Sequence, residues 1–245
     1  MHPFVSVVIP AKNEQGNIGL LIKEISEVLH ALGNIQFEVV LVNDGSKDNT
    51  VIEAKEFAAQ SQCQLQVISH EASCGQSTAL HTGIFHAKGE WIVTSDADGQ
   101  NDPADIPALL QAAQQVQTEH FCIAGFRNKR LDTPWVRLQS KIANGIRQRF
   151  LNDGVPDSGC GLKVFPKRTF QALPYFDHMH RFLPALVKRI NGKIVVCPVN
   201  HRNRAVGQSN YTAWSRAWVG VVDMFGVMWL RKRTKLPRII SEEIE

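Results

Sequence analysis

The chain has 245 residues, of which 44% are hydrophobic and 20% charged, a composition typical of a globular domain with an ordinary core. Its five cysteines are scattered and contain no C-x-x-C pair, which argues against structural zinc and a disulfide framework and favours reduced thiols. The longest apolar stretch, Ala217–Leu230, is interrupted by Asp223 and is too short to span a bilayer. The first residues show no signal-peptide pattern. We therefore expect a cytoplasmic protein whose membrane contact, if any, is at the surface.

The net charge of +4 conceals a strong asymmetry between the two halves of the chain. Residues 1–120 carry 5 Lys/Arg and 15 Asp/Glu, whereas residues 121–245 carry 22 and 8. An acidic front half suits a metal ion or a neutral sugar. A basic back half suits phosphates or an anionic membrane surface, and nucleic acid is a further alternative at this point.

In the first 125 residues, short apolar segments alternate with segments of helical periodicity. Strands are expected at Val5–Ile9, Phe37–Val42, Leu65–Ser69, Trp91–Thr94 and Phe121–Ala124. Helices are expected at Asn17–Leu32, from about Ser46 to Gln60, at Ser77–Lys88 and at Pro103–Val116. Fully apolar strands between helices predict an α/β fold with a mostly parallel sheet covered on both faces.

The second half of the chain has a looser pattern. We expect a basic helix at Arg137–Leu151, a strand at Leu162–Phe165, a helix at His180–Ile190, a strand at Ile194–Val199 and a helix or two at Tyr211–Arg233. No linker composition separates these elements. The chain is therefore interpreted as one catalytic domain, residues 1–210, followed by an amphipathic, basic helical tail, residues 211–245.

Polar segments rich in carboxylates follow three of the expected strands, and ligands bind at the carboxyl ends of strands in such sheets. The segments are 10–14, 43–46 and 95–100. Asp96 and Asp98 can converge on one hard cation, and oxygen ligands of this kind suit Mg²⁺ or Mn²⁺. A bare Asp-x-Asp also fits a solvated turn, but Gln100 and the helix-opening Pro103 make the context more specific.

The string Ser95-Asp-Ala-Asp-Gly-Gln-Asn-Asp-Pro103 resembles the metal-binding motif of family-2 glycosyltransferases with the GT-A (Rossmann-like) fold, and so do the segments 8–14 and 42–50. Within that family the chain is most similar to the polyprenyl-phosphate branch, which includes dolichol-phosphate mannose synthase, over about residues 4–210. The resemblance implies inverting, metal-dependent transfer of a sugar from a nucleotide sugar to a polyprenyl phosphate of the undecaprenyl or dolichyl type. It favours a UDP-linked donor.

The resemblance also implies roles for individual residues on the donor side. Residues that match the family's nucleotide-sugar site are Pro10, Ala11, Asn13, Glu14, Asp44 and Asp96. Asp44 matches the acid that contacts the base or ribose, although helix capping or turn formation would also explain it. Asp96, Asp98 and Gln100 match the metal site. The metal would stabilise the charge that develops on the departing nucleoside diphosphate.

The acceptor and diphosphate sites are implied in the basic half. Residues matching the acceptor-phosphate positions are Arg127, Arg137 and Ser140, with a solvated basic helix face as the alternative. Residues matching the late basic loop over the donor diphosphate are Arg202, Arg204 and Ser209. The family's usual Ser-Lys is Ser209-Asn210 here, so one expected cation is missing. Asp157 matches the segment near the sugar, where it would bind donor hydroxyls or, for a hydroxyl acceptor, serve as general base. A phosphate acceptor is already ionised and needs no base.

The tail combines Trp214, Trp218 and Trp229 with the cationic run Arg231–Arg233, a pattern that fits an interfacial helix on an anionic leaflet. Packing on the domain, on an integral-membrane partner or in a homo-oligomer would also explain it. Two rival functions remain from the sequence: transfer to a saccharide or lipid hydroxyl, and nucleotide or nucleic-acid binding without catalysis. The intact set Asp96, Asp98 and Gln100 disfavours the second, so nucleic acid is not an expected partner.

Overall fold

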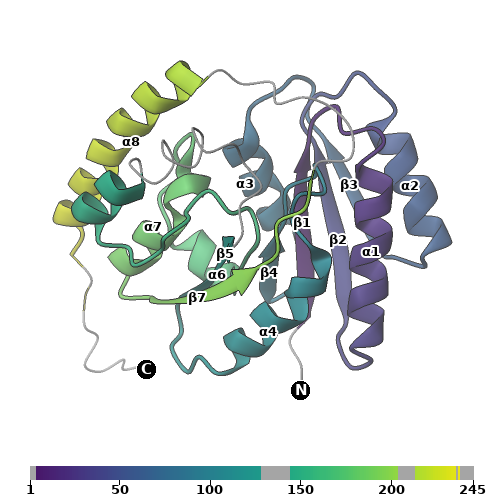
Figure 1. Cartoon of the computed structure of the whole chain (residues 1–245), viewed down its shortest axis with the longest axis horizontal. Coiled ribbons are helices and arrows are strands. Elements are labelled where there is room, and N and C mark those ends of the chain that lie inside the picture. The colour runs from purple at the N-terminus through teal and green to yellow at the C-terminus, as the bar shows by residue number, and fades with distance from the viewer. Residues whose placement is uncertain (1–3, 128–143, 204–212, 236, 238–245) are drawn as a thin grey trace, which may run out of the picture.

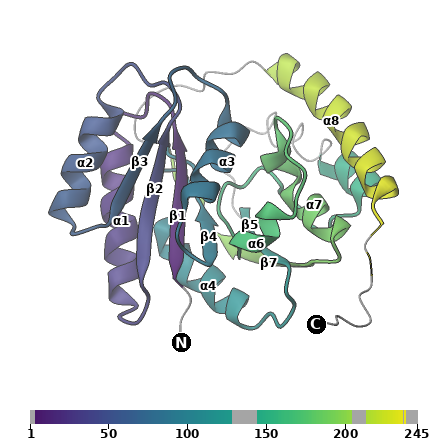
Figure 2. The same cartoon turned by 180° about the vertical axis from the view of Figure 1, so that it is seen from behind.

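A computed structural model describes residues 4–127, 144–203, 213–235 and 237, with the backbone alone for residues 213–218. Its centre is a seven-stranded sheet in the order β3-β2-β1-β4-β6-β5-β7, with helices on both faces (Figures 1 and 2). The strands are β1 Val5–Ala11, β2 Phe37–Asn43, β3 Leu65–Ser69, β4 Trp91–Thr94, β5 Phe121–Arg127, β6 Lys163–Pro166 and β7 Lys193–Val199. β6 pairs antiparallel with both of its neighbours, and every other pairing is parallel. The expected mostly parallel α/β sheet is confirmed.

The helices divide between the two faces of the sheet. They are α1 Ile18–Ala31, α2 Thr50–Gln60, α3 Gln76–His86, α4 Ile106–Gln114, a helix at 144–151, α6 Lys167–Gln171, α7 Leu183–Arg189 and α8 Ala213–Arg233, with short 3₁₀ turns η1 Pro103–Asp105 and η2 Met179–Phe182. Buried side chains of α1, α2 and α4 share one core cluster with the sheet. Those of α3, α6, α7 and α8 share a second cluster on the opposite face. The apolar stripe of each helix thus faces the sheet, on one side or the other.

The region expected as one helix at His180–Ile190 is instead divided into η2 and α7. His178, the residue before η2, has φ 62°, a left-handed backbone conformation at which the chain changes direction. Pro184 then stands in the first turn of α7, where its missing N–H costs nothing. The break therefore follows from local backbone chemistry that the apolar spacing alone does not show.

Helix α8 packs on the domain beside the helix at 144–151, at the opposite end of the molecule from α1 and α2 (Figure 1). Met224 and Val227 of α8 are buried in the same cluster as Leu151. Arg231 of α8 donates a hydrogen bond to the Leu151 carbonyl. The boundary expected at residue 210 lies outside the described residues. Within the described residues, no helix combines the length and the apolar character that crossing a membrane requires.

The sheet gathers several chain segments at one edge. The carboxyl ends of β1, β2 and β4 lie there, because these strands are parallel neighbours. Antiparallel β6 runs the other way, so its beginning reaches the same edge as the end of β5; Ala124 pairs with Lys163. Residues before β6, rather than after it, therefore join the site.

Candidate active site

The loops that follow β1 and β2 are joined by direct hydrogen bonds. Asn13, at φ 55°, donates its N–H to Ser46 Oγ (3.0 Å) and accepts the Lys47 N–H at its Oδ1 (2.8 Å). The Glu14 N–H donates to Thr50 Oγ1 (2.9 Å). These hydrogen bonds hold the two loops against each other at the edge of the sheet where the nucleotide site is expected.

Pro10 and Ala11 end β1 and pair with Val42 and Asn43 of β2. The carbonyl of Ala11 accepts the N–H of Asp44 (2.8 Å), which extends the ladder by one bond beyond the strands. Pro10 and Ala11, together with Asn13 and Glu14 in the loop that follows, therefore lie at the carboxyl end of β1, next to the loop that follows β2.

Asp44 is buried, and its carboxylate is surrounded by donors from the segment that follows β3. Oδ1 accepts from His70 Nδ1 (2.8 Å) and the Cys74 N–H (2.8 Å), while Oδ2 accepts from Ser73 Oγ (2.7 Å) and the Gly75 N–H (2.9 Å). Burial alone would raise the pKa of Asp44, but these hydrogen bonds outweigh it and lower the pKa. A carboxylate has about four acceptor positions. In this structure Asp44 therefore shapes the 70–75 loop, and its contact with a base or ribose stays a prediction.

Asp96 and Asp98 follow β4 in a tight loop that hydrogen bonds organise. Asp96 Oδ1 accepts from Gln76 Nε2 (2.8 Å), and the Asp96 N–H donates to Asn101 Oδ1 (3.0 Å). Asp98 Oδ1 accepts the N–H of Gln100 (3.1 Å). The three residues expected to bind metal are thus presented by one short loop.

The electrostatics of Asp96 suit a cation. Burial, followed by repulsion from Asp98, raises the pKa of Asp96 to about 6, although Lys163 and Arg127 act in the opposite direction. A divalent cation between the two carboxylates would remove that repulsion, and carboxylate and amide oxygens are the ligands that Mg²⁺ and Mn²⁺ take. The donor set of Asp96, Asp98 and Gln100 therefore fits such an ion.

Arg127 and Asp157 form a bidentate pair across 30 residues of sequence. Arg127 Nε donates to Asp157 Oδ2 (2.6 Å), and Nη2 donates to Oδ1 (2.9 Å). Desolvation of Arg127 would lower its pKa, but the Asp157 hydrogen bond and charge raise it, so the guanidinium is permanently cationic. The Arg127 charge also reaches the acidic loop, because it acts to lower the pKa of Asp96. The structure thus unites two residues that sequence reasoning assigned separately to acceptor and sugar.

The backbone of Arg202 contacts the 96–100 loop, and its side chain turns toward Glu24 of α1 and Asp102, the residue just before η1. Its N–H donates to the Gln100 carbonyl (3.0 Å). Its guanidinium donates to Glu24 (2.6 Å) and Asp102 (2.5 Å). In this arrangement Arg202 fixes the loop against the domain, and its contact with a diphosphate stays a prediction. Four further expected site residues lie outside the described residues: Arg137, Ser140, Arg204 and Ser209.

Sequence reasoning missed the segment after β3 and a buried lysine. β3 ends at the same edge as β1 and β2, so the strand-end rule would have pointed to His70 and Gln76 had it been applied there. Lys163 is buried at the start of β6, where it donates to the Ser158 carbonyl (3.4 Å) and to the Cys160 carbonyl. The sequence feature that could have indicated a buried role for Lys163 is its place as the single cation among the apolar residues Leu162, Val164 and Phe165.

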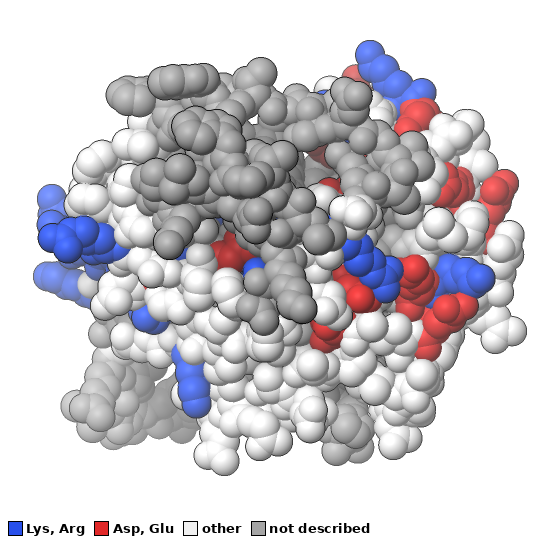
Figure 3. Space-filling view, in the orientation of Figure 1, with Lys and Arg blue, Asp and Glu red and all other residues white. Residues whose placement is uncertain are grey.

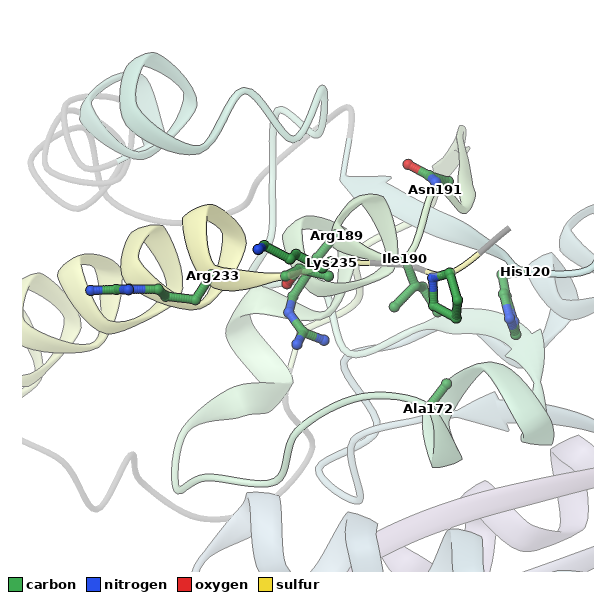
Figure 4. A pocket seen from close by; sticks show the side chains of 9 residues that line it. His120, Ala172, Arg189, Ile190, Asn191, Arg233 and Lys235 are labelled. Carbon is green, nitrogen blue, oxygen red and sulfur yellow. The ribbon is translucent and has the colours of Figure 1, made fainter. Parts of the chain in front are cut away.

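A cavity of about 740 Å³ lies at the other edge of the sheet, next to the starts of β5 and β7 (Figure 4). Its lining includes Arg189, Arg233, Lys235 and His120. Figure 4 shows Arg233 extending away along α8 while the guanidinium of Arg189 points elsewhere, so the cations do not converge on one ligand position. The acidic site at the carboxyl edge is the better candidate for chemistry.

The strand order and the acidic loop after β4 are those of a glycosyltransferase with the GT-A fold. Crystallised glucosyl-3-phosphoglycerate synthase from Mycobacterium tuberculosis, in complex with Mn²⁺, UDP and phosphoglyceric acid, superposes with a TM-score of 0.66 at 18% identity, over 95% of this chain and 80% of that one. That likeness concerns the fold. The chain belongs to glycosyl transferase family 2, whose model matches residues 6–173.

Two relatives share more of the sequence. Undecaprenyl-phosphate 4-deoxy-4-formamido-L-arabinose transferase of Edwardsiella ictaluri is 33% identical over 208 residues, which cover 85% of this chain and 63% of the relative. Dodecaprenyl-phosphate galacturonate synthase of Rhizobium johnstonii is 29% identical over 236 residues, 95% of this chain and 69% of the relative. The chain thus spans about two thirds of the length of these relatives. Both are named for sugar transfer involving a polyprenyl phosphate.

Proposed function

We propose that this glycosyltransferase moves a sugar, with inversion, from a nucleotide sugar to a polyprenyl phosphate, using Mg²⁺ or Mn²⁺. The observation that carries the proposal is the loop that presents Asp96 and Asp98 beside the Arg127–Asp157 pair. Acids suit a metal-bound diphosphate donor, and a cation suits a phosphate acceptor. The names of both relatives support the acceptor class, and the fold neighbour that binds UDP supports a uridine donor.

The donor would lie along the edge formed by the loops after β1, β2 and β4. Pro10, Ala11, Asn13 and Glu14 would face the nucleoside, and Asp44 would keep the neighbouring 70–75 loop in shape. Asp96, Asp98 and Gln100 would hold the cation. When bound, the ion supplies Lewis-acid stabilisation of charge on the leaving diphosphate.

The acceptor needs an attacking oxygen but no protein base. A phosphate monoester has a second pKa of about 6 and is largely ionised at neutral pH. Arg127 would neutralise and orient it, with Arg137 and Ser140 as further contacts. Asp157 accepts hydrogen bonds from Arg127 at both carboxylate oxygens, an arrangement suited to positioning a guanidinium rather than to accepting a proton.

We further propose that the enzyme docks peripherally on the inner, anionic face of the cell membrane. Phe225 and Trp229 of α8 are 56% and 60% exposed, and Phe150 of the adjacent helix is also exposed. Lys and Arg side chains gather at the end of the molecule where α8 lies, whereas acidic side chains gather toward α1 and α2 (Figures 1 and 3). Apolar side chains flanked by cations suit an anionic lipid surface.

The test of the reaction is transfer of radiolabelled sugar from UDP- and GDP-sugars to undecaprenyl phosphate in detergent with Mn²⁺ or Mg²⁺. We expect one donor to give a lipid product with the wild type and none with Asp98→Ala. If the only acceptors that work are hydroxyl compounds, the phosphate-acceptor part is wrong. In that case Asp157→Asn should abolish the hydroxyl reaction, since that reaction needs a base.

The docking proposal is tested by flotation with vesicles of phosphatidylglycerol or phosphatidylcholine. We expect binding to the anionic vesicles that high salt weakens, and a loss of binding in Phe225→Ser/Trp229→Ser. Ile52→Ser, at an exposed apolar residue of α2, is the matched control. Equal binding of the double variant and the wild type would refute docking through α8.

A further inference from the structure

The first turn of α3 connects the two acidic parts of the site. The Gly75 N–H donates to Asp44 Oδ2 (2.9 Å), and the side chain of the next residue, Gln76, donates to Asp96 Oδ1 (2.8 Å). Gly75 has φ 89°, a conformation that glycine adopts readily, so the chain can turn between these two contacts. One short turn therefore touches the loop ends of both β2 and β4.

We propose that Gln76 is a positioning residue that holds the Asp96 carboxylate in the orientation required by a divalent cation, an inference that rests on the metal-dependent function proposed above. Asp96 is confined from two sides. The Gln76 amide donates to Oδ1, and Gly161 approaches so closely that a Cβ there would overlap the carboxylate. Donors that fix a metal-binding carboxylate from outside the coordination sphere set its direction and its affinity.

Asp96 needs such a restraint because its carboxylate must face the same point as that of Asp98. The Asp98 carboxylate is itself held by the Gln100 N–H (3.1 Å). Without the donor on Oδ1, repulsion between the two carboxylates would turn the Asp96 side chain away from Asp98. A hydrogen bond from a neutral amide holds the carboxylate without competing with the metal ion for its negative charge, as a lysine or arginine in the same place would do.

The turn that carries Gln76 is itself held in place by hydrogen bonds to η2. Ser77 is buried, and its Oγ lies 2.7 Å from His180 Nδ1 and accepts the His180 N–H (3.2 Å). Burial, with lesser contributions from nearby cations, lowers the pKa of His180 well below its usual value, so the ring is neutral at pH 7. η2 therefore anchors the start of α3 through Ser77, and this fixes the backbone position from which the Gln76 side chain extends.

The experiment measures Mn²⁺ binding directly, by the electron paramagnetic resonance signal of free Mn²⁺ in titrations of the protein with saturating UDP. Gln76→Met preserves side-chain length but removes the amide donor. We expect it to raise the Kd for Mn²⁺ by about 10- to 100-fold, the usual effect of losing an outer hydrogen bond to a metal ligand. Gln111→Met, at an exposed residue of α4, is the matched control and should bind as the wild type does. Gln76→Ala, measured alongside, provides the same information should Gln76→Met fail to fold.

Ser77→Ala should raise the Kd in the same direction by a smaller factor, because it loosens the turn and leaves the amide in place. Wild-type Mn²⁺ affinity in Gln76→Met, when Asp98→Asn has lost binding, would overturn the positioning role and leave the metal site standing. If the wild type and Asp98→Asn bind Mn²⁺ equally poorly, the metal part of the proposed function fails, and the role of Gln76 fails with it. Thermal unfolding of each variant shows whether a change in affinity reflects a loss of folded protein.

Discussion

The Arg127–Asp157 pair gives a stability prediction that the geometry makes quantitative. Asp157 is 4% exposed and receives two hydrogen bonds from the guanidinium, at 2.6 and 2.9 Å. Arg127→Met would remove both of these hydrogen bonds and the positive charge that makes them. Removing one member of a buried ion pair costs about 3 to 5 kcal/mol of unfolding free energy. For a chain of this length, that loss corresponds to a fall in Tm of about 6 to 20 °C.

The assay is a double-mutant cycle of Arg127→Met, Asp157→Asn and the double variant, measured by urea unfolding in the absence of metal. We expect the double variant to be more stable than the sum of the single losses predicts, with a coupling of at least about 1 kcal/mol. Arg168→Met is the matched control. Arg168 lies 3.8 Å from Glu119 with both side chains about two thirds exposed, and such a pair contributes about 0 to 1 kcal/mol.

A coupling near zero, with Arg127→Met no worse than Arg168→Met, would refute the reasoning. It would mean that the two residues do not stabilise each other in solution. The catalytic arm is separate: transfer to polyprenyl phosphate should fall but persist in Asp157→Asn, because an asparagine can still contact Arg127 and no base is needed. Complete loss of transfer at unchanged stability would instead support Asp157 as a base.

Three further predictions concern the acidic loop and its neighbours. Asp96→Asn should stabilise the metal-free protein by about 1 to 3 kcal/mol at pH 7.5, because its folded pKa is raised to about 6. That gain should shrink as the pH falls and vanish below about 4; a gain independent of pH in urea unfolding would contradict it. Asp44→Asn should cost about 1 to 3 kcal/mol at pH 7 by leaving backbone donors unsatisfied. Since the folded pKa of Asp44 is below 3.8, its contribution is present above that value and lost as the pH falls through the folded pKa, so the cost should diminish in acid unfolding. Gly161→Ala should weaken Mn²⁺ binding about tenfold or more, because the added Cβ would displace the Asp96 carboxylate. Gly159→Ala is the control, since its Cβ would make only ordinary contacts. Equal Mn²⁺ affinities for the two variants would show that Asp96 tolerates the displacement.

The elements of the first half could be predicted from the sequence because their signals are local. The strand expected at Val5–Ile9 is observed at Val5–Ala11, and the strand expected at Trp91–Thr94 has the same bounds in the structure. Apolar runs ended by turn residues indicate such strands without any knowledge of the fold. The acidic segment 96–100 was likewise recognisable, since two carboxylates at a strand end are a short-range pattern.

Contacts between distant segments could not be predicted in this way. Nothing in the Lys163–Pro166 segment indicates that it runs antiparallel between β4 and β5, because direction depends on where the preceding chain returns. The four donors to Asp44 come from residues 26 to 31 positions later, and Gln76 lies 20 positions before Asp96. Periodicity carries no information about such partners.

The direction of β6 has a consequence for how enzymes of this shape can diversify. Strand β5 ends at Arg127 and β6 begins at Lys163, and the two strands are paired at Ala124 and Lys163. Arg127 and Lys163, which flank residues 128–162, therefore lie on adjacent strands, and closing a loop between adjacent strands costs little more when the loop is lengthened. An exchange of residues 128–162 would preserve the strand order and the proposed donor site. Arg127 in β5 would still bind the acid at position 157 of the exchanged segment. Under the function proposed above, such an exchange would change the acceptor of the reaction and leave the donor site in place.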